Sequence, residues 1–215
     1  MAVIIVICMK LEKIVELFPI PLMVYELGRA LTKSEITFIN SYGTADKRGK
    51  NIGNTYSKDS HVLDHVELKQ LHTDLTGILV DAFERMYSPT SPCAPYITQS
   101  WLNFTDRGQY HHEHIHPNSI LSAVLYLRTA NGDRIVFTKP AADLNILLIE
   151  PRAIDNLTAG SWCQEVKDNT VVVFPSKLPH HVPPVEYEGG RISLSLNTFV
   201  RGEVGARGDF NHLVL

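Results

Sequence analysis

The spacing of hydrophobic positions along the chain changes near residue 90. Before that point, apolar residues recur at helical spacing over the segment 63–87 and form one stripe, which predicts an amphipathic helix. Thr32 with Glu35 three residues later has the spacing of a capping box and predicts another helix, ending near Tyr42. The apolar run 20–27 suits a strand. We therefore expect a helical N-terminal part with one early strand.

From Tyr96 onward the pattern is that of short strands separated by turn signals such as Asn131-Gly132-Asp133. Seven short strands with brief turns favour an antiparallel sandwich or barrel over a parallel sheet. The polar segment 43–61 and the connection 141–169 are expected to be loops, and a long loop at a barrel mouth often carries substrate contacts. The predicted strands are 96–104, 109–116, 120–128, 134–138, 170–175, 180–185 and 191–200.

The length of the chain fits one ordinary globular domain. With 215 residues it can bury a full hydrophobic core, and no linker divides it. We therefore expect a single domain over 1–215. Within it, the pattern indicates a helical part over about 9–88, a β core over about 96–200 and a loose, glycine-rich tail over 201–215.

Charge and cysteine content exclude several kinds of partner. The chain is 44% hydrophobic and 20% charged with a formal net charge of −3, so nothing indicates a nucleic-acid-binding surface. Three scattered cysteines are too few for a disulfide framework or a zinc knuckle, which favours a reducing, cytoplasmic setting. The apolar opening 1–8 is too short to cross a bilayer, so we expect no membrane partner. We interpret it as an edge strand or as sequence preceding a true start at Met9.

Candidate chemistry is concentrated in two histidine-rich windows, 110–117 and 174–182, which hold six of the ten histidines. Because alternate residues of a strand point to the same side, His114 and His116 can face one metal ion together. His180, directly after a hydrophobic strand, is the expected third ligand. Two alternatives remain open at this point, since His112 shares the predicted face of the first pair and His181 could replace His180.

Arg191 and Ser193 form a second two-residue pair on a predicted strand. A guanidinium group pairs with a carboxylate in a planar, bidentate way, and a serine hydroxyl adds one more donor. Beside a metal site, this pair favours a carboxylate-bearing co-substrate. The alternative is that Arg191 pairs across the following turn with Glu186 or Glu188.

The order of these motifs resembles that of the iron(II)/2-oxoglutarate-dependent oxygenases. The residues that carry the resemblance are His-x-His-Pro-Asn-Ser, Leu-Ser-Ala-Val-Leu-Tyr-Leu, Val-Val-Phe-Pro-Ser-x-Leu-Pro-His-x-Val and Arg-Ile-Ser-Leu-Ser-Leu-Asn. With the start Leu17-Phe18-Pro19, the similarity spans 17 to about 200 and is greatest to small proteins of bacteria and phages related to prolyl hydroxylases. It implies a mainly β (α+β) fold, with a double-stranded β-helix (jelly-roll) core and N-terminal helices packed outside.

The resemblance also implies a set of site residues. Two cofactor roles are expected: Fe(II) bound by histidines, and 2-oxoglutarate bound by an arginine, a serine and residues lining the pocket. His180 is preferred over His181 because the family pattern reads Pro-His-x-Val. The implied metal ligands are His114, His116 and His180, and the implied co-substrate residues are Arg191, Ser193, Tyr110, Asn103 and Tyr126.

One position departs from the family pattern, since most members of the wider superfamily have Asp or Glu where this chain has His116. Three neutral imidazoles leave Fe(II) with two positive charges, whereas a carboxylate ligand would leave one. Loaded with dianionic 2-oxoglutarate, the site would be neutral, which is tolerable but changes redox tuning. A nearby carboxylate such as Glu113 is an alternative that would complete the site.

The implied activity is hydroxylation of a small molecule or a peptide side chain, with consumption of O₂ and release of succinate and CO₂. Two other functions fit parts of the pattern. A three-histidine iron site can also serve a cofactor-free dioxygenase, and a jelly-roll with histidines can be a non-catalytic metal-binding module. The sequence leaves a homodimer open and does not identify the substrate.

Overall fold

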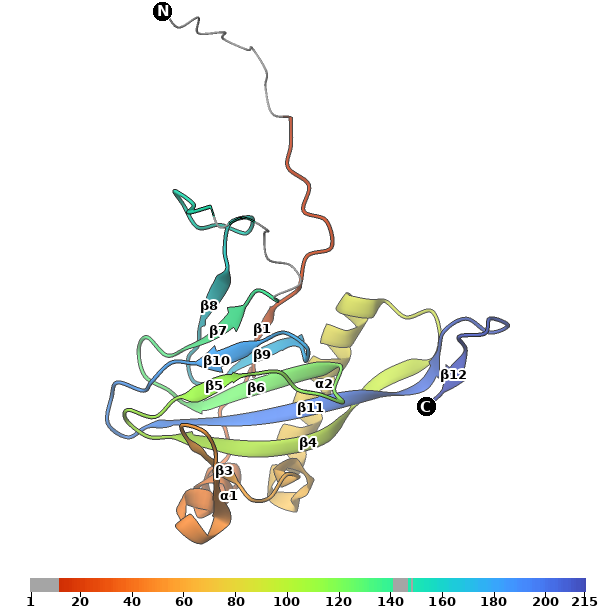
Figure 1. The fold of residues 1–215 in the computed structure, drawn as a ribbon. Coiled ribbons are helices and arrows are strands. Elements are labelled where there is room, and N and C mark those ends of the chain that lie inside the picture. Colours follow the sequence, from red (N-terminus) through yellow and green to blue (C-terminus); the bar gives the residue numbers. More distant parts are fainter. Residues whose placement is uncertain (1–11, 141–146, 148) are drawn as a thin grey trace, which may run out of the picture.

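The computed structural model describes residues 12–140, 147 and 149–215. Two antiparallel sheets face each other, and the helices cover the outer face of the larger one (Figure 1). The strands of the larger sheet are β1 (Met23–Glu26), β2 (Arg48–Lys50), β3 (Thr55–Ser57), β4 (Cys93–Thr105), β6 (Leu121–Arg128), β9 (Thr170–Pro175), β11 (Arg191–Val204) and β12 (Leu213–Val214). They run in the order β1-β9-β6-β11-β4-β3-β2, with β12 paired to the end of β11.

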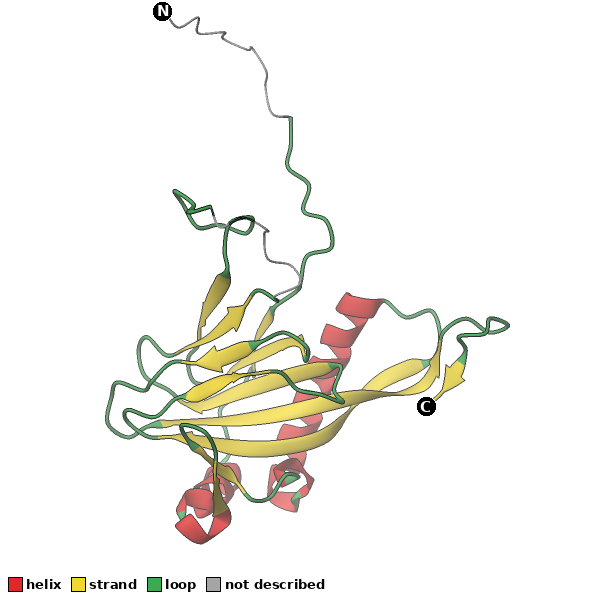
Figure 2. Cartoon of the chain, viewed as in Figure 1, coloured by secondary structure: helices red, strands yellow, loops and turns green. Residues whose placement is uncertain are grey.

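The smaller sheet carries most of the histidine-rich sequence. Its strands are β5 (His111–His114), β7 (Arg134–Thr138), β8 (Ser161–Glu165) and β10 (His180–Val182). They run in the order β5-β10-β7-β8, so the two histidine-bearing strands are direct neighbours. Among the described residues, no strand of one sheet pairs with a strand of the other, so the two sheets do not close into one barrel. Their strands are the yellow arrows of Figure 2.

Strict alternation along the central strands produces two cores. In β9, Val171 and Val173 contribute to the core beneath the helices, whereas Val172 and Phe174 contribute to the core between the sheets. Both faces of this strand are buried, which explains why its sequence is a continuous apolar run. On β11, the inward face instead carries buried polar side chains, and Ser193 is one of them. These polar side chains provide a site between the sheets.

The helices lie on the outside of the larger sheet, as expected. They are α1 (Lys33–Asn40) and α2 (Lys69–Tyr87), and α2 packs across β4 and β6. The predicted capping box is present: the Glu35 backbone N–H donates to Thr32 Oγ1 at 3.2 Å, and the Thr32 N–H donates to Glu35 Oε2 at 2.6 Å. Short 3₁₀ turns flank both helices, at Ser41–Gly43, Ala45–Lys47, Val62–Asp64 and Val66–Leu68.

Several sequence-based expectations need correction. The segment 43–61, expected as a loop, contains the β2–β3 hairpin, and the connection expected over 141–169 contains β8. These three strands are short, and two of them pair with a distant strand, β3 with β4 and β8 with β7. The long helix begins at Lys69, since two 3₁₀ turns occupy its predicted start. Part of the tail is ordered by β12, which pairs with the extended end of β11.

The expectations for 1–8, as an edge strand or as sequence before a start at Met9, lie outside the described residues, as does part of the connection 141–169. In the part of the chain that the structure describes, no helix is long and apolar enough to span a membrane.

Candidate metal centre

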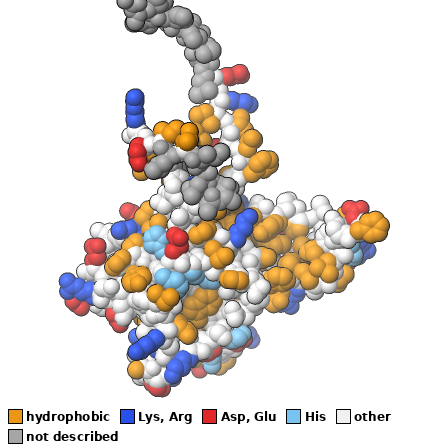
Figure 3. Space-filling model, viewed as in Figure 1, with side chains coloured by type: hydrophobic (Ala, Val, Ile, Leu, Met, Phe, Trp, Pro, Cys, Tyr) orange, Lys and Arg blue, Asp and Glu red, His pale blue; other side chains and the backbone are white. Residues whose placement is uncertain are grey.

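Three histidines meet where β5 and β10 pair. His114 lies directly opposite His180 in the register of these strands, and His116 follows two residues after His114. The backbone N–H of His116 donates to the Ser176 carbonyl at 2.9 Å, which ties it to the end of β9. The ligand nitrogens of the three histidines all lie within 4.8 Å of one another, and Nε2 of His116 is 3.2 Å from Nε2 of His180. Figure 3 shows histidine side chains reaching the surface on this side of the molecule.

Hydrogen bonds to backbone carbonyls orient two of these imidazole rings. Nδ1 of His114 lies 2.8 Å from the His112 carbonyl, and Nδ1 of His180 lies 2.9 Å from the Leu178 carbonyl. Because a carbonyl oxygen only accepts, each Nδ1 carries the proton and each Nε2 keeps a free lone pair. This outer hydrogen bonding is typical of metal-binding histidines.

Burial keeps the three imidazoles uncharged. It lowers the pKa of His180 to about 2 and that of His116 to about 4, and neighbouring imidazoles add to both shifts. Burial also lowers the pKa of His114. Neutral imidazole is the form that binds metal ions, so three neutral, converging nitrogens fit a first-row divalent cation such as Fe(II).

The alternatives left open by the sequence lie outside this cluster. His112 is half-buried, with Nδ1 3.4 Å from the Ile52 carbonyl, and Nδ1 of His181 lies 3.7 Å from Oε2 of Glu113. The Glu113 carboxylate accepts a hydrogen bond from Thr138 Oγ1 at 2.5 Å and is not part of the three-residue group. In the described residues, the expectation that Glu113 completes the site is therefore not met.

A fourth histidine, His111, belongs to the same cavity and was missed by the alternation argument. The pairing of β5 with β10 is irregular between His180–His114 and Val182–His111, which adds a residue on β5. With this bulge His111, rather than His112, lines the cavity, and the His111 and His114 rings stack with centroids 4.4 Å apart. Nε2 of His111 lies 3.1 Å from Asn51 Nδ2 on the β2–β3 hairpin. No local pattern signals such a bulge.

The cavity beside the histidines lies between the two sheets. Asn103, Tyr126 and Ser193, expected to contact the co-substrate, all line it. Tyr110 does not: its side chain is 42% exposed, and its backbone N–H donates to the Gly53 carbonyl. The remaining lining residues are Trp101, His111, His114, His116, Ser122, Ala123, Val124, Ile135, His180, Val182, Ser195 and Leu196.

Arg191 is buried at the start of β11 and pairs with an aspartate that the sequence did not indicate. Its Nη1 donates to Asp133 Oδ1 at 3.0 Å, whereas Glu188 pairs with Arg107 instead. Nη2 of Arg191 and the hydroxyl of Tyr126 are buried donors without a hydrogen-bond partner among the described residues. Arg191 is not among the residues that line the cavity, whereas Tyr126 is. Unpaired buried donors are costly, so these two groups fit a ligand that carries a carboxylate.

The sequence from β4 to β11 is similar to that of one known family. Residues 99–197 match the family model described as putative 2OG-Fe(II) oxygenase. This region belongs to the 2OG-Fe(II) oxygenase family. The match contains all three clustered histidines together with Arg191 and Ser193. No curated protein matches the chain by sequence.

Solved structures of 2OG-Fe(II) oxygenases and related proteins share the fold. A Pseudomonas putida prolyl-4-hydroxylase matches with a TM-score of 0.55 at 13% identity, over 83% of this chain and 92% of that chain. A Trichoplax adhaerens prolyl hydroxylase in complex with a hypoxia inducible factor peptide fragment gives 0.56 at 12% identity, over 83% of each chain. HygX from Streptomyces hygroscopicus, with nickel, 2-oxoglutarate and hygromycin B bound, gives 0.53 at 10% identity, over 83% and 82%. The expected jelly-roll core with outer helices is thus confirmed.

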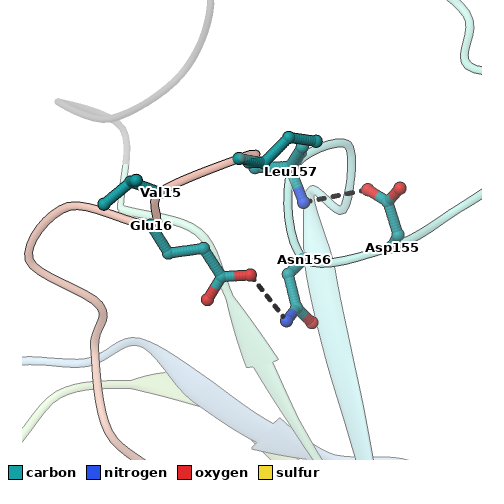
Figure 4. Close-up of a pocket in the computed structure, with 6 residues that line it drawn as sticks. Val15, Glu16, Asp155, Asn156 and Leu157 are labelled. Atoms are coloured by element: carbon teal, nitrogen blue, oxygen red, sulfur yellow. Dashed lines mark hydrogen bonds between the residues drawn. The ribbon is translucent and has the colours of Figure 1, made fainter. Parts of the chain in front are cut away.

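A second hollow lies away from the histidine cavity. It is formed by residues 14–16 of the N-terminal arm and residues 155–157 of the segment before β8 (Figure 4). Asn156 Nδ2 donates to Glu16 Oε1 at 3.2 Å across it. It shares no lining residue with the histidine cavity and contains no histidine or cysteine, so we assign it no chemistry.

Proposed function

We propose that this Fe(II)/2-oxoglutarate oxygenase is a hydroxylase whose Fe(II) is held by Nε2 of His114, His116 and His180. The observation that carries the proposal is the convergence of three neutral imidazole nitrogens within 4.8 Å at the wall of an inter-sheet cavity. Three protein ligands on one side leave other positions of a six-coordinate ion free for co-substrate and O₂. When bound, Fe(II) supplies the chemistry that couples decarboxylation of 2-oxoglutarate to succinate and CO₂ with oxidation of a substrate C–H bond.

The protein's own contribution is orientation and exclusion of water. The carbonyls of His112 and Leu178 hold two ligand rings in the productive tautomer. Arg191 and Ser193 are proposed to bind the distal carboxylate of 2-oxoglutarate, with Tyr126 donating beside them. Asn103 Nδ2 donates to Ser195 Oγ at 2.9 Å, which leaves its buried amide oxygen free to accept from a ligand.

The substrate is proposed to be a small molecule or a peptide side chain, as its structural relatives bind both kinds of ligand. The cavity is bordered by His111, whose ring is held by Asn51 of the β2–β3 hairpin. A substrate entering beside this hairpin would meet the uncharged amide of Asn51 and the His111 ring. Since Cys93 and Cys163 are free thiols, a reducing, cytoplasmic setting is part of the proposal.

The all-histidine ligand set favours one alternative, a cofactor-free dioxygenase in which the substrate itself binds the metal. Anaerobic titration separates the two functions. Metal-free protein is loaded with Fe(II), and 2-oxoglutarate is then added while the visible charge-transfer band of the chelate is recorded. We expect the band to form in the wild type and to require far more 2-oxoglutarate in Arg191→Ala. Iron binding without any band would support the cofactor-free dioxygenase, and no iron binding would leave a jelly-roll without this chemistry.

A further inference from the structure

The arginine proposed to bind the co-substrate is held by a buried carboxylate on another strand connection. Asp133 lies just before β7, and its Oδ1 accepts from Arg191 Nη1 at 3.0 Å. Only 7% of Asp133 and 3% of Arg191 is exposed. A buried ion pair carries a large desolvation cost, so its presence beside a ligand cavity calls for a functional reason.

Asp133 is fixed from three sides. The Tyr187 hydroxyl donates to Oδ2 at 2.5 Å, and the Ala130 backbone N–H donates to the same oxygen at 3.1 Å. Burial and the hydrogen bond to Asp133 raise the pKa of Tyr187, so its phenol stays protonated and remains a donor. The carboxylate therefore cannot rotate without losing two contacts that do not involve Arg191.

Arg191 has fewer constraints of its own. Among the described residues, its guanidinium makes a hydrogen bond only to Asp133, through Nη1. Its Nη2 is buried and free, and so is the hydroxyl of Tyr126. The orientation of the free Nη2 is thus set by the contact that Nη1 makes with Asp133.

We propose that Asp133 and Tyr187 are positioning residues that fix the guanidinium of Arg191 so that its free Nη2 can bind the distal carboxylate of 2-oxoglutarate. This inference rests on the proposed function. It assigns two residues outside the metal-binding cluster, neither of which lines the cavity. They act through Arg191.

The formal charges explain why a carboxylate, that of Asp133, is suited to the position next to Arg191. Three neutral imidazoles leave Fe(II) with two positive charges, and 2-oxoglutarate brings two negative ones. If one of the metal ligands were a carboxylate, its negative charge would balance the positive charge of the arginine. Here the metal cluster contains only histidines, and Asp133 supplies the balancing negative charge next to Arg191 instead. The loaded site is then neutral overall.

The test compares two 2-oxo acids that share the metal-chelating end. 2-Oxoglutarate has the distal carboxylate, whereas 2-oxopentanoate lacks it. Dissociation constants for both are measured anaerobically from the charge-transfer band of the Fe(II) protein, for the wild type, Asp133→Ala and Tyr187→Phe. Glu188→Gln is the control, because Glu188 is an exposed carboxylate of the same region that pairs with Arg107.

We expect Asp133→Ala to raise the dissociation constant of 2-oxoglutarate about tenfold or more, the range of a lost hydrogen bond to a charged group. Tyr187→Phe, which changes no charge, should act in the same direction by a smaller factor. The constant for 2-oxopentanoate and the affinity for Fe(II) should stay within twofold of the wild type. An unchanged or lowered constant for 2-oxoglutarate in both variants would overturn the inference, whereas a wild type that binds neither acid would contradict the proposed function.

A double variant tests whether Asp133 acts through Arg191. In an Arg191→Met background, Asp133→Ala should cause no further loss of 2-oxoglutarate affinity. It should also raise the thermal midpoint above that of Arg191→Met alone, because the single variant leaves the Asp133 charge buried without its partner. A further loss of affinity in the double variant would show that Asp133 acts independently of Arg191 and would contradict the positioning role.

Discussion

At the scale of single residues, the site depends on which histidines share one side of a strand pair. His180 lies opposite His114, is 3% exposed and holds its ring by a hydrogen bond to the Leu178 carbonyl. His181, the next residue, extends to the other side of the strand, near Glu113. The two neighbours therefore provide a matched pair of variants for the metal site.

We expect His180→Ala to reduce Fe(II) affinity by more than the roughly 10–100-fold that is typical of lost outer contacts, since it removes a proposed ligand. His181→Ala should leave the affinity within a few-fold of the wild type. Anaerobic isothermal titration with Fe(II), and with Mn(II) as a redox-stable substitute, measures both. Equal losses in the two variants would contradict the assignment of His180.

At the scale of secondary-structure elements, α1 is anchored by charge as well as by its cap. Glu35 is 1% exposed and receives hydrogen bonds from Nη1 and Nη2 of Arg29 at 2.9 and 2.7 Å. Arg29 also donates from Nε to Asp74 of α2 at 2.6 Å. The N-terminus of one helix is thus linked to the other through a single arginine.

This arrangement predicts a pH dependence of stability. The hydrogen bond from Arg29 holds the pKa of Glu35 below its ordinary value of 4.5 in the folded protein. A carboxylate with a lowered pKa contributes stability above the unfolded value, and this contribution is lost as pH falls through the folded value. Chemical denaturation between pH 7 and 3 should therefore show the wild type losing stability below about pH 4.5 more steeply than Glu35→Gln. If the unfolding free energies of the wild type and Glu35→Gln fell in parallel with pH, the Arg29–Glu35 ion pair would contribute nothing to stability.

The cap itself can be tested separately. Thr32→Ala removes the hydroxyl that accepts from the Glu35 N–H and should cost about 1 kcal/mol of unfolding free energy at neutral pH. Thr32→Ser, which keeps the hydroxyl, is the matched control and should lie close to the wild type. The denaturant midpoints of the wild type and the two variants, compared where the m-value is unchanged, measure the difference in unfolding free energy.

At the scale of the whole molecule, the two cores have different roles. The core beneath the helices contains Leu75 of α2, whereas the core between the sheets contains Phe174 of β9. The centroid of the Phe174 ring lies 4.6 Å from the centroid of the His180 ring and 5.0 Å from that of the Phe137 ring. The second core therefore contacts the metal cluster directly, through the Phe174 ring.

We expect Phe174→Ala to lower the unfolding free energy by about 3–5 kcal/mol and Leu75→Ala by about 2–5 kcal/mol. Fe(II) affinity, measured on the folded fraction well below the melting temperature, should fall clearly in Phe174→Ala and remain near the wild-type value in Leu75→Ala. Equal affinities in the two variants would show that the position of the His180 ring does not depend on the inter-sheet core.

Much of the fold could be predicted because its signals are local. Strands 134–138 and 170–175 were placed with the observed bounds, and the capping box of α1 follows from two residues three apart. The strands β2, β3 and β8 were missed because each is short. β3 and β8 pair with strands far away in the sequence, and β2 joins the sheet only through β3. The jelly-roll was predicted from the similarity in motif order to a known family. Hydrophobic periodicity alone predicted only an antiparallel sandwich or barrel.

The sequence by itself determined the alternating strands, the antiparallel class of the fold and the histidines available for a cluster, because side-chain direction along a strand follows from a period of two. The tertiary structure decided which of them meet. Pairing of β5 with β10 sets His180 opposite His114, a bulge brings His111 rather than His112 to the cavity, and Asp133 becomes the partner of Arg191. These contacts join segments tens of residues apart and depend on register and bulges, which no local period encodes.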